Sequence, residues 1–138
     1  MSIFIDTGPL YAFFDRRDQY NRWTGEQFAN ITQPLIACEA VIAETVFLML
    51  GSGISPSNLF EFAHREHLQI LPVLNKREGL ERVREIISKY SNLPASVADA
   101  SLLYLAENKR DAEIFTLDHH FTIYRTPNDK PISLISPF

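Results

Sequence analysis

Short apolar runs alternate along the chain with longer stretches of helical pattern. A run that is apolar at nearly every position is typical of a strand buried on both faces of a parallel sheet. Such runs occupy residues 2–5, 34–38, 69–74, 113–117 and 132–135. Helical stretches occupy residues 10–14, 20–31, 40–50, 76–90 and 94–108, and Ser55-Pro56-Ser57 begins another. This alternation predicts an α/β fold in which helices cover both faces of a parallel sheet of four or five strands.

Two of the predicted helices differ in how they distribute apolar residues. Residues 40–50 are apolar almost all round the helix, so we expect this helix to be largely buried. The helix at residues 76–90 is charged and amphipathic. We expect its inward positions to be Leu80, Val83, Ile86 and Ile87. A loop at residues 6–9 separates the first strand from a short helix that Pro9 favours.

Length and composition are those of one folded unit. The chain has 138 residues, a mass of 15.8 kDa and 46% hydrophobic residues, which argues against a disordered chain. No linker, repeat or low-complexity stretch interrupts it. We therefore expect a single domain over residues 1–138.

The charge balance excludes some functions and leaves others open. There are 13 Lys and Arg against 17 Asp and Glu, so the net charge is -4. This balance excludes a protein that binds long nucleic acids mainly through an overall basic surface. The single cysteine, Cys38, excludes an internal disulfide and a cysteine-based zinc site. No apolar run approaches the length of about 18 residues that a membrane span needs. We expect a soluble, cytoplasmic protein without a membrane partner.

Four of the acids stand where acids are unusual. Asp6 directly follows the first apolar run and Asp118 follows the fourth. In open α/β sheets ligands bind beyond the carboxyl ends of the strands, although aspartate is also common there as a turn or cap residue. Glu44 lies inside the apolar helix at residues 40–50, where an ionised carboxylate needs a partner: a metal ion or a structural salt bridge.

Asp99 allows two interpretations. It follows Ser96 at the spacing of a capping box, in which it would only close the start of a helix. It also shares a helical stripe with Leu103 and Ala106, which would place it inward.

If the sheet gathers the strand ends, all four acids converge. Four carboxylates in one pocket require cations, and oxygen ligands without His or Cys suit Mg²⁺ or Mn²⁺. Such ions activate water for phosphodiester hydrolysis, so a phosphate-ester hydrolase follows as the hypothesis.

The segments that carry these acids resemble the PIN-domain family, and most closely the single-domain VapC-type ribonucleases of toxin–antitoxin pairs. The matching segments occur in the expected order between residues 4 and 121. They are Phe4-Ile5-Asp6-Thr7, the helix with Glu44, Ala98-Asp99-Ala100-Ser101-Leu102, and Phe115-Thr116-Leu117-Asp118 with Phe121. The resemblance implies a three-layer α/β/α sandwich with a central, mostly parallel sheet. It also implies that Asp6, Glu44, Asp99 and Asp118 hold Mg²⁺ or Mn²⁺ and cleave single-stranded RNA, with Thr7 and Thr116 orienting ligands or water.

The resemblance implies protein partners as well as RNA. Relatives of this kind commonly form homodimers, and antitoxin proteins occlude the acidic pocket. For RNA contacts the best candidates are Arg16, Arg17 and Arg22, for which a solvated basic face is the alternative. The alternative function is a PIN-like module that binds RNA or protein without cutting RNA.

Overall fold

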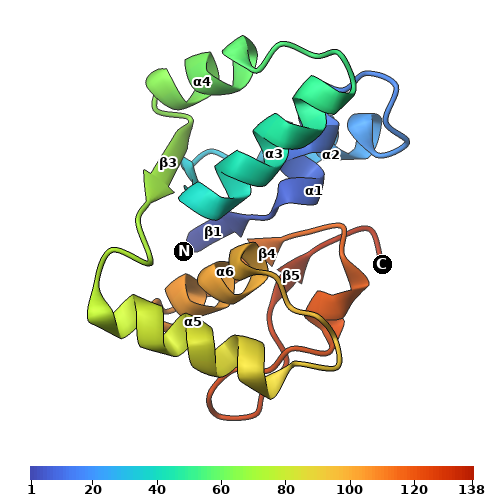
Figure 1. Ribbon diagram of the computed structural model, residues 1–138. Coiled ribbons are helices and arrows are strands. Elements are labelled where there is room, and N and C mark those ends of the chain that lie inside the picture. Colours follow the sequence, from blue (N-terminus) through green and yellow to red (C-terminus); the bar gives the residue numbers. More distant parts are fainter.

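Five parallel strands form one sheet in a computed structural model that describes all 138 residues (Figure 1). The strand order is β3–β2–β1–β4–β5, and every pairing is parallel. The strands are β1 Ser2–Ile5, β2 Leu35–Cys38, β3 Leu68–Leu71, β4 Ala112–Phe115 and β5 Leu134–Ile135. Each overlaps a predicted apolar run; β1 is buried along most of its length, and β4 is buried in its second half. The predicted parallel α/β fold is confirmed.

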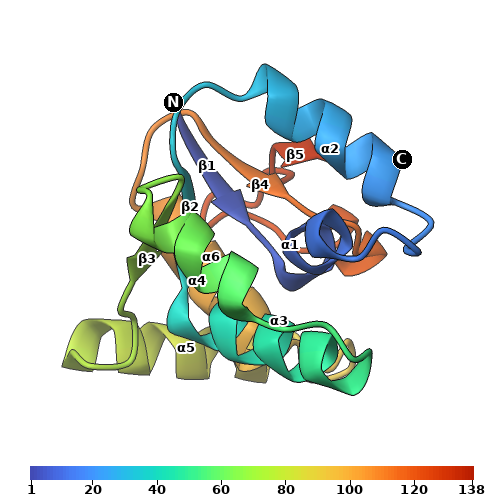
Figure 2. The ribbon, with the colours of Figure 1, turned by 90° about the horizontal axis from the view of Figure 1, so that it is seen from above.

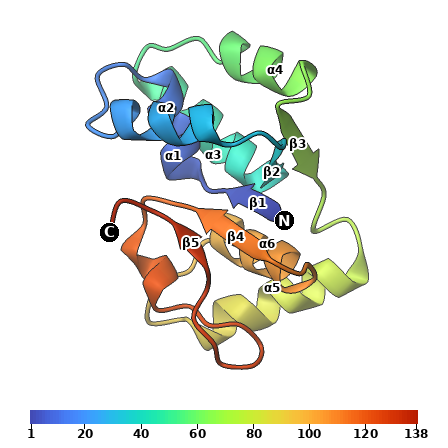
Figure 3. The ribbon, with the colours of Figure 1, turned by 180° about the vertical axis from the view of Figure 1, so that it is seen from behind.

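Six α-helices cover the sheet, and one 3₁₀ helix follows β4. They are α1 Thr7–Phe14, α2 Asn21–Asn30, α3 Glu39–Gly51, α4 Ser57–His64, α5 Arg77–Lys89, α6 Val97–Glu107 and η1 His119–Thr122. Helix α2 lies on one face of the sheet, and α3, α5 and α6 lie on the other (Figures 2 and 3). Helix α4 contacts the edge strand β3. None of these helices combines the length and apolar character that crossing a membrane requires.

The order of the strands creates a switch point at the centre of the sheet. The chain runs outward from β1 through β2 to β3, then crosses back and places β4 on the other side of β1. The ends of the two strands are in register, because Ile5 pairs with Phe115 and the backbone N–H of Asp6 donates to the Phe115 carbonyl at 2.9 Å. Residues that follow β1 and β4 therefore meet at the edge where parallel sheets bind ligands.

Helix α1 corrects the expected start of the first helix. It begins at Thr7, directly after Asp6, and no loop separates it from β1. Pro9 is tolerated within the first turn because the N–H groups of that turn have no helical acceptor. Asp6 is consequently fixed between a buried strand and a helix.

Helix α3 was expected to be largely buried, and this expectation is wrong. Its buried residues form one stripe at a spacing of four, namely Val41, Thr45 and Met49. The opposite face is open, with Phe47 77% exposed and Leu50 62% exposed. The helix packs on α1, α6 and β2 along one side only, so its uniform apolar composition did not indicate burial on all sides.

Helix α5 differs from the prediction at one inward position. Val83 and Ile86 are buried as expected and Ile87 is half-buried, whereas Leu80 is 55% exposed. The neighbouring Gly79 lies against the backbone carbonyl of Val73, so closely that a Cβ atom would not fit. Because this contact turns Gly79 inward, the next residue along the helix faces solvent.

Candidate metal centre

Asp6 and Asp118 come from neighbouring strand ends and share one partner, Thr116. Asp6 is 5% exposed, and the buried Thr116 hydroxyl donates to its Oδ2 at 2.8 Å. The same hydroxyl accepts from the backbone N–H of Asp118 at 3.0 Å. The Thr116 hydroxyl thus connects the two aspartates, and its role in orienting ligands or water stays a prediction. The Oδ1 atom of Asp118 accepts from the His120 N–H at 2.9 Å.

Asp99 reaches the same place from the first turn of α6. The Ser96 hydroxyl accepts from the Asp99 N–H at 3.0 Å, so Ser96 caps the helix as the capping-box spacing predicts. The Asp99 side chain is also turned inward and is 8% exposed. The hydroxyl of Tyr124 donates to its Oδ2 at 2.8 Å. Asp99 therefore does more than close the helix, because its backbone N–H takes part in the cap while its carboxylate turns inward to Tyr124.

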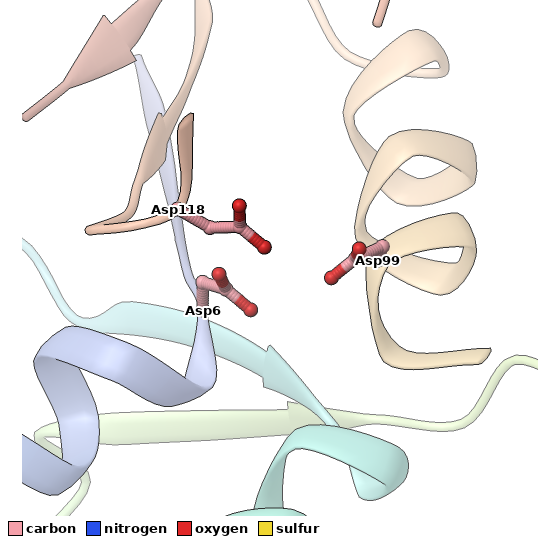
Figure 4. A group of neighbouring side chains, drawn as sticks. All are labelled: Asp6, Asp99 and Asp118. Carbon is pink, nitrogen blue, oxygen red and sulfur yellow. The ribbon is translucent and has the colours of Figure 1, made fainter. Parts of the chain in front are cut away.

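The three aspartates converge on one point. One oxygen from each of Asp6, Asp99 and Asp118 can be chosen so that all lie within 4.8 Å of one another. Figure 4 shows the three carboxylates pointing toward a common space, Asp6 and Asp118 from the strand ends and Asp99 from α6. They line a pocket of about 700 Å³ that Glu44 and Thr7 also line. We call this site the acidic pocket.

The electrostatics of the acidic pocket favour a cation. No lysine or arginine lies within 4.0 Å of these three carboxylates. Burial and, after it, the nearby charge of Asp99 raise the pKa of Asp6 to about 7. Burial also raises the pKa of Asp99. Three such groups are ionised together at neutral pH only with a compensating charge, and an all-oxygen donor set fits a hard divalent cation such as Mg²⁺ or Mn²⁺.

Glu44 lies at the rim of the acidic pocket, outside the cluster of three. It is exposed on α3, contrary to the expected burial. Its Oε2 accepts from the Thr7 hydroxyl at 2.9 Å, so Thr7 orients it as Thr116 orients Asp6. None of the ion pairs in the structure includes Glu44, so the alternative of a structural salt bridge is not realised. A role for Glu44 as a metal ligand stays a prediction.

The three arginines proposed as RNA contacts do not line the acidic pocket. The Arg17 guanidinium lies 3.8 Å from Asp15 and donates to the Ser52 carbonyl, and that of Arg22 lies 3.5 Å from Glu26. Arg16 is exposed without an ion-pair partner. A role for these arginines in RNA binding stays a prediction.

Tyr124 is a site residue that the sequence analysis missed. It is fully buried, donates to Asp99, and its ring lies 5.0 Å from that of Phe121. Burial, together with the charge of Asp99, raises the pKa of its hydroxyl, so it remains a donor. Residues 122–125 show neither helical nor strand periodicity, and no pattern in the sequence predicts that this tyrosine returns to the pocket.

An acidic, oxygen-only site at the switch point of a parallel sheet defines the class of this domain: an α/β protein whose acidic cluster fits a hard cation. Comparison with known families identifies it further. The chain belongs to the PIN domain family, whose model matches residues 3–126. Among curated proteins no sequence matches it.

Among solved structures, the crystal structure of VapC20 from Mycobacterium tuberculosis has a similar fold. That protein is described as a toxin that cleaves the sarcin–ricin loop. The TM-score is 0.76 at 18% sequence identity, and the match covers 88% of this chain and 94% of that one. At this identity the likeness shows the fold.

Proposed function

We propose that this protein is a Mg²⁺- or Mn²⁺-dependent endoribonuclease that hydrolyses phosphodiester bonds of single-stranded RNA as the toxin of a toxin–antitoxin pair. The observation that carries the proposal is the convergence of Asp6, Asp99 and Asp118 within one pocket without a protein cation. Such a site is costly for a fold to keep unless it binds a metal ion.

The aspartates are prepared for this role by the hydrogen bonds around them. Thr116 holds Oδ2 of Asp6, Tyr124 holds Oδ2 of Asp99, and the N–H of His120 holds Oδ1 of Asp118. One oxygen of each carboxylate is anchored, which leaves the other available as a ligand with little further ordering. Glu44 adds a fourth carboxylate from the rim, oriented by Thr7. A bound Mg²⁺ or Mn²⁺ would supply activation of water and stabilisation of the leaving oxygen.

RNA as the substrate class rests on the family and on the likeness to VapC20. The carboxylates repel a phosphodiester that enters the acidic pocket until a cation is bound, so the metal is needed to seat the scissile phosphate as well as for chemistry. The RNA target and the cleavage sequence are set by residues outside the three aspartates.

A protein partner is part of the same proposal. Two large apolar side chains of α3, Phe47 and Leu50, are mostly exposed, and so is Phe60 of α4. Their exposure supports contact with another protein, either a second copy of the chain in a homodimer or an antitoxin. The aromatic side chains of α1, by contrast, are largely packed against the core.

The experiment is a cleavage assay with purified protein and a labelled single-stranded RNA, in Mn²⁺, in Mg²⁺ and in EDTA. We expect cleavage with either metal and none with the chelator. The variant Asp6→Asn should fold and lose at least about a hundredfold in cleavage rate, since it removes a ligand at the centre of the site. Asp129→Asn, at an exposed turn, is the matched control.

Cleavage that EDTA does not change would contradict the metal mechanism. RNA binding without cleavage in any metal would instead favour the alternative function of a PIN-like binding module without turnover.

A further inference from the structure

A groove of about 840 Å³ runs between α5, the end of α6 and the segment of residues 125–133. Figures 1 and 3 show this segment passing beside the C-terminal half of α5. The basic residues that line it are Arg82, Lys89, Lys109, Arg110, Arg125 and Lys130. Two acids, Glu107 and Asp111, also line it. We call it the basic groove, because its lining carries four more positive than negative charges in a chain whose net charge is -4.

We propose that the basic groove binds the sugar–phosphate backbone of the RNA substrate, beside the acidic pocket that cleaves it. The inference rests on the proposed function for the identity of the polyanion. It assigns the groove a separate role: to hold the RNA through its phosphates, without reading its bases.

The pairing of charges sets the groove apart from the rest of the surface. Five of the 13 lysines and arginines lie within 4.0 Å of an Asp or Glu carboxylate, which leaves eight that do not. Five of these eight line the basic groove. Of its two acids, Glu107 is already neutralised by Arg82, at 2.7 and 3.1 Å. The groove therefore concentrates cations that the protein itself leaves without anionic partners.

The local structure holds these cations in place. Nη1 of Arg125 donates to the carbonyls of Thr122, Ile123 and Tyr124 at 2.9 to 3.2 Å. These contacts use one nitrogen of the guanidinium and leave the others for a ligand. Lys130 closes a tight turn in which its carbonyl accepts from the Thr126 N–H at 2.8 Å and its own N–H donates to the Thr126 hydroxyl. A phosphate chain would meet the guanidinium of Arg125 at a fixed place and the side chain of Lys130 on a fixed stretch of backbone.

One end of the basic groove adjoins the acidic pocket. The N–H of Arg125 donates to the Tyr90 hydroxyl at 2.9 Å, and the Tyr90 and Tyr124 rings lie 4.9 Å apart. Tyr124 in turn donates to Asp99. A single side chain thus separates the end of the groove from a carboxylate of the candidate metal centre. The groove and the pocket share no lining residue, but this short path through the buried Tyr124 places one end of the groove near the candidate metal centre. That proximity favours the RNA substrate over an acidic segment of a partner protein as the ligand.

The test is the salt dependence of RNA binding, measured by fluorescence anisotropy with a labelled single-stranded RNA in EDTA. The groove variant is Lys109→Gln with Lys130→Gln, two exposed positions. The control is Lys76→Gln with Arg77→Gln, which makes the same charge change at the opposite end of α5. We expect the groove variant to bind about tenfold more weakly and its salt slope to fall by about 1.4, because each lost phosphate contact on a single strand contributes about 0.7. The control should keep the wild-type slope.

Equal weakening in both variants would show an effect of net charge alone and overturn the proposal, as would unchanged binding by a folded groove variant. Binding of a labelled oligoglutamate that depends on the groove, with RNA binding that does not, would identify an acidic protein segment as the ligand and also overturn it. The two proposals fail separately. Metal-dependent cleavage together with RNA binding that does not depend on the groove would overturn only the groove proposal. RNA binding that depends on the groove, without cleavage in any metal, would overturn only the nuclease proposal.

Discussion

The buried Tyr124 connects the acidic pocket with the basic groove by donating to Asp99 and packing on Tyr90, yet the two regions hold their charges in different ways. In the pocket, Asp6 and Asp99 are buried and converge on one point with Asp118. In the groove, cations such as Lys109 and Lys130 are exposed and spread along a surface. Convergent buried charges suit one small hard ion, and spread exposed charges suit a long polyanion.

The difference shows why the net charge of -4 says little about function. The formal charges of the two regions nearly cancel when they are added, while each region alone has a strong local electrostatic potential. The free-energy cost of leaving a charge unpaired also differs between the two regions. A buried carboxylate is unfavourable without its ion, whereas an exposed lysine costs almost nothing when unpaired. Removal of charge should therefore affect folding in the pocket and only binding in the groove.

The largest expected effect is on the pH dependence of stability in metal-free protein. Below about pH 4 the Asp6 carboxyl is protonated in both the folded and the unfolded chain. Between pH 4 and 7 the unfolded chain ionises while the folded protein keeps its proton, so stability falls as the pH rises; above 7 the penalty is constant. Asp6→Asn should thus be more stable than the wild type by about 2–4 kcal/mol at pH 8 and equal to it near pH 4.

Urea unfolding in EDTA at a series of pH values measures this difference. Asp129→Asn, an exposed acid, should follow the wild type throughout. Saturating Mn²⁺ should reverse the order at pH 8, because the ion stabilises only the protein that can bind it. If Asp6→Asn has the wild-type profile in EDTA, the burial penalty in the acidic pocket does not exist.

A smaller effect is expected at the rim of the pocket. Glu44→Gln should raise the Mn²⁺ concentration for half-maximal cleavage about tenfold, since the Gln oxygen is a weaker ligand oriented by the same Thr7 hydroxyl. Its thermal stability in EDTA should stay at the wild-type value, because the side chain is exposed and has no ion-pair partner. Glu39→Gln, on the same helix, is the control. A stability loss at unchanged metal requirement would assign Glu44 a structural role.

The sequence predicted the parts of the site that follow from strand ends. Asp6 and Asp118 each follow an apolar run, and parallel strands bring such residues to one edge. Their meeting also requires β4 to lie beside β1, a strand order that the sequence left open. Asp99 was left open between two roles, because a capping residue and an inward carboxylate have the same spacing. Only the packing of α6 against the sheet shows that one residue fills both.

Other features depend on contacts that leave no periodic pattern. The exposure of α3 depends on how many elements surround it, which its composition does not specify, and Glu44 was consequently expected to be buried. Arg125 and Lys130 belong to a turn closed by a bridge between Arg125 and Pro131, and Tyr124 directly precedes this turn. The basic groove appears only when this turn packs beside α5.

The central claim is that the acidic pocket binds a divalent cation, and calorimetric titration of Mn²⁺ into the metal-free protein tests it most directly. The account predicts saturable binding by the wild type and by Asp129→Asn, and an affinity at least about a hundredfold lower in Asp6→Asn. Equal Mn²⁺ affinity in Asp6→Asn and the wild type would contradict it.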